Sequence, residues 1–167
     1  MNDTEMLLEP TSGVYLTPEG FESLQKELEH LTAVKRPEIA ERIRESQGHG
    51  EFAEDHSELD EVKFEQAMVE NRIGELKAIF GTATIIDLAK IPTDRIVVGS
   101  LVKVQDPTFG DDFEVRLVSG IEADPDRDLV SSDSPMGAAL LGSSEGDTVT
   151  FESPEGRKRF KVLKISR

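Results

Sequence analysis

The feature that most constrains the fold is a pair of apolar seams at helical spacing. The first seam runs from Phe21 to Ile43 and the second from Leu59 to Phe80. Spacings of three and four residues keep side chains on one face of a helix, so each seam needs a partner surface. Two seams joined by a short turn predict an antiparallel coiled-coil hairpin. The predicted seam positions are Phe21, Leu24, Leu28, Leu31, Ile39, Ile43, Leu59, Val62, Gln66, Val69, Ile73, Leu76 and Phe80.

The first helix has recognisable start and end signals. Thr17 is suited to cap the free amides of a helix, and Pro18 falls at the position that needs no amide donor. Pro37 lacks an amide proton inside the segment, so we expect a kink or local irregularity there. From Pro18 to about Gln47 the helix would be ~45 Å long, at ~1.5 Å per residue. That length exceeds any core this chain could form around it, so we expect the hairpin to project.

The turn between the seams is unusually acidic. Between Arg44 and Lys63 there are seven carboxylates and no Lys or Arg. Two interpretations are open: a finger that ligates a metal ion inside another assembly, or a solvated turn whose acids favour the positive end of a helix dipole. His49 and His56 flank the acids and are compatible with a zinc or manganese site, or with solvated polar residues. The seven acids are Glu45, Glu51, Glu54, Asp55, Glu58, Asp60 and Glu61.

The charge and composition restrict the partners. The net charge is −15; residues 1–81 carry 19 acids and 8 bases, whereas residues 82–167 carry 15 and 11. Bare nucleic acid and anionic lipid repel such a chain, so the partner should be basic or carry metal ions. The absence of Cys excludes disulfides and thiolate zinc sites. No apolar run approaches the ~20 residues needed to span a bilayer, so we expect a cytoplasmic monomer without a membrane partner.

After Gly81 the pattern changes to period two, which is typical of strands. Ser134 and Pro135 cap and open a short helix that ends before Gly142. These elements predict an α+β fold, in which the hairpin precedes a small sheet domain with one helix. The expected strands are Ala83–Asp87, Ile96–Val104, Phe113–Ile121, Thr148–Glu152 and Arg157–Ile165. The expected domains are a tail (1–13), a coiled-coil finger (14–81), a first strand and linker (82–95) and a sheet domain (96–167).

Four segments, in this order and spacing, resemble the Gre transcript-cleavage factors of bacterial RNA polymerase. They are Leu16–Gly20, Val34–Ile39, the tip that begins at His49-Gly50, and Ser134–Gly142 followed by Glu145-Gly146-Asp147. The resemblance spans nearly everything from Tyr15 to Arg167. It implies a coiled-coil finger that enters the secondary channel of RNA polymerase, and a C-terminal docking domain of FKBP-like fold without isomerase activity.

The resemblance also implies roles for the tip residues. Glu51 takes the place of the family's metal-ligating Asp, and Glu54 that of its second acid. Glu51 would then help to hold the second Mg²⁺ of the polymerase and Glu54 the attacking water, while Asp55 and Glu58 support them. The chain would have no cofactor of its own. It would act as an accessory factor and not as an enzyme, since the polymerase itself would cleave the backtracked RNA near its 3′ end.

The tip departs from the family pattern Gly-Asp-Leu-x-Glu-Asn-Ala-Glu-Tyr. Asp55 replaces Asn, His56 replaces Ala, and Leu59 replaces Tyr. The extra CH₂ of Glu51 moves its carboxylate by ~1.5 Å, a scale that matters for metal geometry. These changes leave a second hypothesis open, namely an inhibitor or modulator that occupies the secondary channel and slows nucleotide addition without cleavage.

Two further groups are candidate contacts. Asp133, Ser134 and Pro135 match the family segment that meets the polymerase at the channel rim, although Ser134 also has a local role as a helix cap. Four bases on the first helix are candidates to contact RNA phosphates or acidic channel walls. The alternative for them is a solubilising face with pairs such as Glu38 and Arg42 at helical spacing. The four bases are Lys35, Arg36, Arg42 and Arg44.

Overall fold

The computed structural model describes residues 13–48 and 57–167, which form two compact units. One unit is Phe21–Thr82, and the other combines the described residues up to Gly20 with Ala83–Arg167. The expected finger began at residue 14, but residues 14–20 group with the second unit. The reason is a parallel pairing of β1 (Val14–Leu16) with β2 (Ala83–Ile85).

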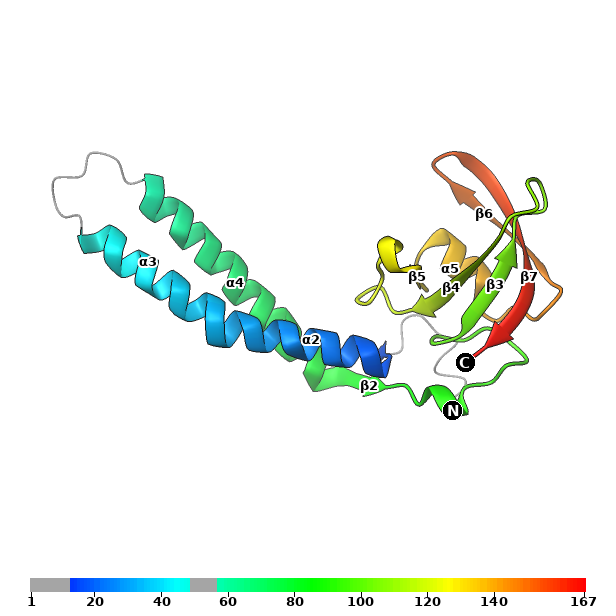
Figure 1. Ribbon diagram of the computed structural model, residues 1–167, viewed down its shortest axis with the longest axis horizontal. Coiled ribbons are helices and arrows are strands. Elements are labelled where there is room, and N and C mark those ends of the chain that lie inside the picture. Colours follow the sequence, from blue (N-terminus) through cyan, green and yellow to red (C-terminus); the bar gives the residue numbers. More distant parts are fainter. Residues whose placement is uncertain (1–12, 49–56) are drawn as a thin grey trace. The chain divides into compact units, whose positions relative to one another are not determined.

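The first unit is the predicted antiparallel hairpin. Its first arm consists of α2 (Pro18–His30), a π-helical turn (Leu31–Lys35) and α3 (Arg36–Gly48), and its second arm is α4 (Ser57–Thr82). Figure 1 shows α3 and α4 running alongside each other. The irregularity expected at Pro37 is confirmed in the turn just before it. There the Arg36 amide donates to the Leu31 carbonyl, five residues back, because a proline ring does not fit regular α-helical packing against the preceding turn.

The two seams pack against each other as expected, with one exception. Leu24, Ile39, Val62, Ile73 and Leu76 are buried, and Phe21 meets Phe80 edge to face with ring centroids 5.2 Å apart. The prediction for Gln66 was wrong, since this polar residue is exposed. Its neighbour Glu65 is partly buried instead and faces the first arm, where it pairs with two bases. The remaining seam positions, Leu28, Leu31, Ile43, Leu59 and Val69, are partly buried.

An ion pair also joins the two arms near the base of the hairpin. Arg72 donates to both carboxylate oxygens of Glu27, at 2.7 and 3.0 Å, and to Glu75 at 3.1 Å. These hydrogen bonds, above all those that Glu27 accepts, raise the pKa of Arg72. The pair connects α2 to α4 across the hairpin.

We predict a measurable coupling between Arg72 and Glu27. In a double-mutant cycle with Arg72→Ala and Glu27→Ala, the coupling should be about 0.5 kcal/mol, because the two side chains remain 38% and 37% exposed and solvent screens them. In 1 M KCl the Debye length falls to about 3 Å, so the coupling should nearly vanish. Thermal unfolding followed by circular dichroism measures both values. A coupling that salt leaves unchanged would contradict this account.

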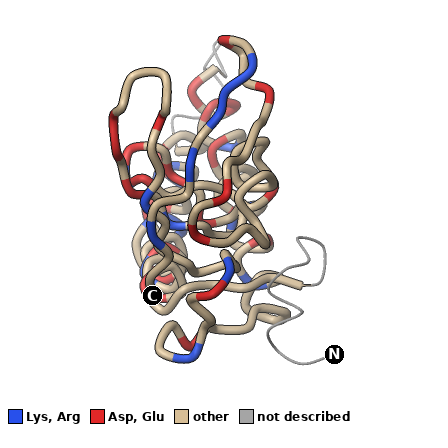
Figure 2. Tube along the Cα trace, turned by 90° about the vertical axis from the view of Figure 1, so that its right-hand side faces the viewer, with Lys and Arg blue, Asp and Glu red and all other residues tan. Residues whose placement is uncertain are grey.

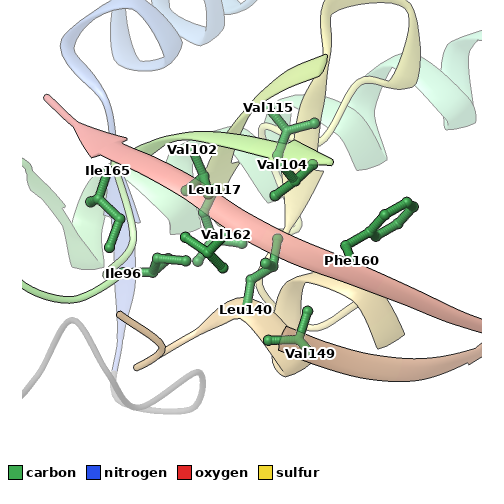
Figure 3. Close-up of a cluster of buried hydrophobic side chains, with 10 residues drawn as sticks. All are labelled: Ile96, Val102, Val104, Val115, Leu117, Leu140, Val149, Phe160, Val162 and Ile165. Carbon is green, nitrogen blue, oxygen red and sulfur yellow. The ribbon is translucent and has the colours of Figure 1, made fainter. Parts of the chain in front are cut away.

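The second unit is a five-stranded sheet with the order β5-β4-β3-β7-β6. It is antiparallel except between β4 and β5, and the short helix α5 (Pro135–Leu140) packs on its inner face. Figure 3 shows Leu140 among valines and other apolar side chains from the strands, and this cluster is the core of the unit. The α+β fold class is therefore confirmed. The strands are β3 (Leu101–Gln105), β4 (Asp112–Val118), β5 (Leu129–Ser131), β6 (Thr148–Ser153) and β7 (Gly156–Ser166).

The strands expected over Ala83–Asp87 and Phe113–Ile121 end earlier, at Ile85 and Val118, and two larger differences follow. Residues 96–100, expected as the start of a strand, form a buried turn in which the Val97 amide donates to Ser100 Oγ and Gly99 has a φ of +101°. The apolar run therefore reflects burial and not strand pairing. Strand β5 was not predicted, because three residues are too few to show a period. By contrast, the predicted turn at 153–156 is confirmed between β6 and β7.

The segment expected as a linker, within residues 82–95, is packed against the second unit. Ile86 and Ile91 are 4% and 3% exposed and form a small second cluster with Val97 and Val98. A single-turn helix, Leu88–Lys90, is capped by the Asp87 side chain. None of the helices in residues 13–48 and 57–167 is long and apolar enough to cross a membrane.

Candidate functional site

The predicted tip falls mostly outside the described residues. Glu51, Glu54, Asp55, His49 and His56 all lie there, so their proposed roles stay predictions. The acids that border the tip are described at the ends of α3 and α4. All of them are exposed, and none of them forms an ion pair with a described residue. These bordering acids are Glu45, Glu58, Asp60 and Glu61.

The described part of the chain contains no group of three or more His, Asp or Glu residues that could hold a metal ion. The predicted Mg²⁺ ligands, Glu51 and Glu54, are outside it. Their donor set consists only of carboxylate oxygen, which is the ligand type that Mg²⁺ prefers. Glu58 occupies the first turn of α4, where a carboxylate also stabilises the positive end of the helix dipole.

The four bases on the first arm are all engaged by acids of the hairpin. Arg36 forms two hydrogen bonds to Glu70, at 2.7 and 2.8 Å, and this contact raises the pKa of Arg36 and lowers that of Glu70. Arg42 donates to Glu65 at 2.6 Å, which raises the pKa of Arg42. Glu38, at the helical spacing expected for a partner of Arg42, also raises the pKa of Arg42 by charge attraction, but less than Glu65 on the opposite arm does.

The other two bases are paired as well. Lys35 lies 4.0 Å from Glu65, and Arg44 pairs with Glu41 one turn earlier. These contacts stabilise the hairpin itself. Among the described hairpin residues, the four acids that border the tip form no ion pair, and neither do Glu29, Glu38, Lys63 and Lys77.

One apolar pair on the hairpin was missed by the sequence reasoning. Phe64 and Met68 are 69% and 57% exposed although both are large and apolar. Four residues apart on α4, they share one helix face close to the acidic end. Their positions outside the seam were the signal that could have identified them.

The segment Asp133-Ser134-Pro135 forms a rigid corner before α5. Ser134 Oγ donates to the Ser131 carbonyl at 2.7 Å and accepts from the Gly137 amide at 3.1 Å, so the predicted capping role is confirmed. Pro135 occupies the first turn of the helix. The Asp133 amide donates to Ser131 Oγ, and its side chain stays exposed.

One glycine, Gly137, allows this corner to close. A Cβ on Gly137 would lie 1.8 Å from the Ser131 carbonyl oxygen, so only glycine fits there. A Cβ on Gly120 would lie 3.6 Å from Asp133 Oδ2, which places the Asp133 carboxylate over the Gly120 backbone. The corner thus presents a negative charge in a defined position, as a docking contact requires.

Comparison with known proteins gives consistent matches for both units. The N-terminal domain model of transcription elongation factors matches residues 14–85, and the GreA/GreB C-terminal model matches residues 91–167. The transcription elongation factor GreA of Caldanaerobacter subterraneus is 43% identical over 92% of this chain and 98% of its own length. That of Alkaliphilus oremlandii is 44% identical over 92% and 96%. Among solved structures, the GreA factor homolog 1 protein of Thermus thermophilus is 32% identical, with 93% and 99% coverage and a TM-score of 0.43.

Proposed function

Because the chain belongs to the GreA/GreB family of transcription elongation factors, we propose that it stimulates the cleavage of backtracked RNA by RNA polymerase. The hairpin would enter the secondary channel of the polymerase and carry the acidic tip to its active site. The observation that best supports this proposal is the charge distribution. The four bases Lys35, Arg36, Arg42 and Arg44 are paired with acids of the hairpin, whereas the acids that border the tip form no ion pair with a described residue. As an accessory factor in the cytoplasm, the chain would leave the bond cleavage to the polymerase.

Within this proposal the tip residues supply oxygen ligands and position a water molecule. Glu51 would ligate the second Mg²⁺, and Glu54 would hold the attacking water as its proton leaves. Asp55 and Glu58 would support these two residues. Of the two Mg²⁺ ions in such a site, one would activate the water and the other would stabilise the leaving oxygen. The RNA 3′ end inside the complex would be the substrate.

The altered tip is also compatible with a competing function, namely inhibition of nucleotide addition by the polymerase. Excess carboxylates at Glu51 and Asp55 could hold the same Mg²⁺ in an unproductive arrangement and block nucleotide entry. The two functions can be distinguished by adding the full chain to a backtracked elongation complex and to an active one. RNA cleavage in the first complex supports the proposal, whereas slower nucleotide addition in the second without cleavage in the first supports inhibition.

We predict that Asp133 contributes to docking. Asp133→Asn should weaken binding to RNA polymerase about tenfold, because it removes one charge-assisted contact of about 1.4 kcal/mol. Fluorescence anisotropy with labelled full chain measures the affinity. Asp126→Asn is the matched control, since Asp126 is an exposed acid on a neighbouring single-turn helix of the same unit. Equal affinities for both variants and the unsubstituted chain would remove Asp133 from the docking surface.

A further inference from the structure

The last strand carries a concentration of positive charge that the proposed function does not use. Residues 156–167 contain six Lys or Arg and no Asp or Glu, in a chain of 19 bases and 34 acids. Figure 2 shows basic positions recurring along the strand that leads to the C-terminus. A protein with a net charge of −15 does not need these cations for solubility.

The register of β7 places its central cations on the outer face of the sheet. Phe160, Val162 and Ile165 point into the core, as Figure 3 shows, so the residues that alternate with them face the other side. Arg159 and Lys161 follow each other on that side at a spacing of about 6.6 Å, two residues at about 3.3 Å each. A shift of register after Lys161 brings Lys164 to the same face, opposite Lys103 of β3.

The cross-strand neighbours of these cations are hydrogen-bond donors and not acids. Arg159 lies opposite a threonine, Lys161 lies between a threonine and a glutamine, and Lys164 lies opposite a lysine. Within the described residues, Arg159, Lys161 and Lys164 form no ion pair. Lys103, opposite Lys164, is paired with Asp112 at 3.9 Å and lies opposite Glu114 on its other side, so only Lys164 of this like-charged pair is without an acid. The basic sheet face, as we call it, consists of Lys103, Gln105, Thr148, Thr150, Arg159, Lys161 and Lys164.

An exposed aromatic ring borders this face. Phe109 is 77% exposed, on a tight loop between β3 and β4 in which the Asp106 carboxylate accepts from the Thr108 amide at 2.8 Å. An open groove is lined by Phe109 together with Thr150 and Arg159, and two acids, Asp106 and Glu155, also line it. The groove thus combines one aromatic ring with cations and a hydroxyl group.

We propose that the basic sheet face and Phe109 bind a single-stranded nucleic acid. Lys, Arg, Thr and Gln side chains are the usual partners of phosphate oxygens, and an exposed aromatic ring provides a stacking surface for a base. An acidic protein segment would use the cations but would leave Phe109 without a role. Acids lie at the edges of this surface: Asp112 pairs with Lys103 at 3.9 Å, Glu114 lies opposite Lys103, and Asp106 and Glu155 line the groove. The site therefore depends on Arg159, Lys161 and Lys164, which form no ion pair within the described residues. The inference is independent of the tip and of cleavage.

Titration of labelled oligonucleotides tests this site. Full chain is added to fluorescein-labelled 15-nucleotide single strands of RNA and of DNA, at KCl concentrations from 20 to 200 mM. With three unpaired cations at phosphates, log K should fall against log salt with a slope of about −2, three times 0.7. The variant Arg159→Gln/Lys161→Gln/Lys164→Gln should lower the affinity at least tenfold and bring the slope close to zero. Phe109→Ala should lower the affinity about fivefold or more and leave the slope unchanged, since stacking releases no counterions.

A matched variant distinguishes an effect of the basic sheet face from an effect of the chain's net charge. Lys63→Gln/Lys77→Gln/Lys90→Gln changes the charge of the chain by the same amount at exposed positions that are not part of the basic sheet face, and it should bind like the unsubstituted chain. Circular dichroism verifies that all variants are folded. Three results would overturn the proposal: no binding at 20 mM KCl, an equal loss in the matched variant, or displacement of the oligonucleotide by poly-glutamate at equal charge concentration. Preference for RNA or for DNA would identify the natural strand.

Discussion

Glu51→Gln and Glu54→Gln should each reduce factor-stimulated cleavage of backtracked RNA by about 100-fold or more. The carboxylate contributes several kcal/mol of transition-state stabilisation if it ligates the metal or holds the water, and each 1.36 kcal/mol corresponds to a factor of ten in rate. Glutamine keeps the size of the side chain and removes its charge. The measurement is the cleavage rate of labelled RNA in a halted elongation complex, at saturating concentrations of each variant.

Glu45→Gln is the control for this experiment. It removes one exposed acid at the end of α3, where no ligand role is assigned, and its cleavage rate should change less than twofold. If all three variants bind the polymerase equally well, the lower cleavage rate is due to the cleavage step and not to weaker docking. The cleavage proposal fails if both tip variants cleave as fast as the unsubstituted chain.

Gly137→Ala should destabilise the C-terminal unit severely. The added Cβ would lie 1.8 Å from the Ser131 carbonyl oxygen and 2.7 Å from its carbonyl carbon, so the backbone of β5 or of α5 has to move. Overpacking of this kind costs about 1–3 kcal/mol or more. The shift would also break the two hydrogen bonds of Ser134 that hold the docking corner. Denaturant unfolding followed by circular dichroism should show a lower midpoint, and affinity for the polymerase should fall in parallel.

Replacing Gly74 by alanine should have the opposite effect on stability. Gly74 is exposed within α4, and no heavy atom lies within 4 Å of a Cβ built there. Alanine loses less conformational entropy than glycine when a helix forms, so Gly74→Ala should stabilise the hairpin by about 0.5–1 kcal/mol. If Gly137→Ala were also neutral or stabilising, the tight contact with Ser131 would not exist in solution.

Elements whose signals are local were predictable from the sequence. The hairpin follows from a repeat of three and four residues, the irregularity follows from Pro37, and the cap of α5 follows from Ser134 with Pro135. In each case the residues that carry the signal lie within one or two turns of the structure they specify. The acidic character of the tip is likewise a matter of composition along one short stretch.

Only the tertiary structure decided which distant residues face each other. Glu65, and not Gln66, lies at the interface between the arms, because the arms' relative rotation determines which residue meets Arg42. The apolar run at 96–100 is a buried turn because it contributes to both apolar clusters of its unit. The basic sheet face exists because pairing aligns β3, β6 and β7 from opposite ends of that unit. Sequence periodicity specifies which side of an element is buried, but contacts between distant segments depend on register, which only the packed chain defines.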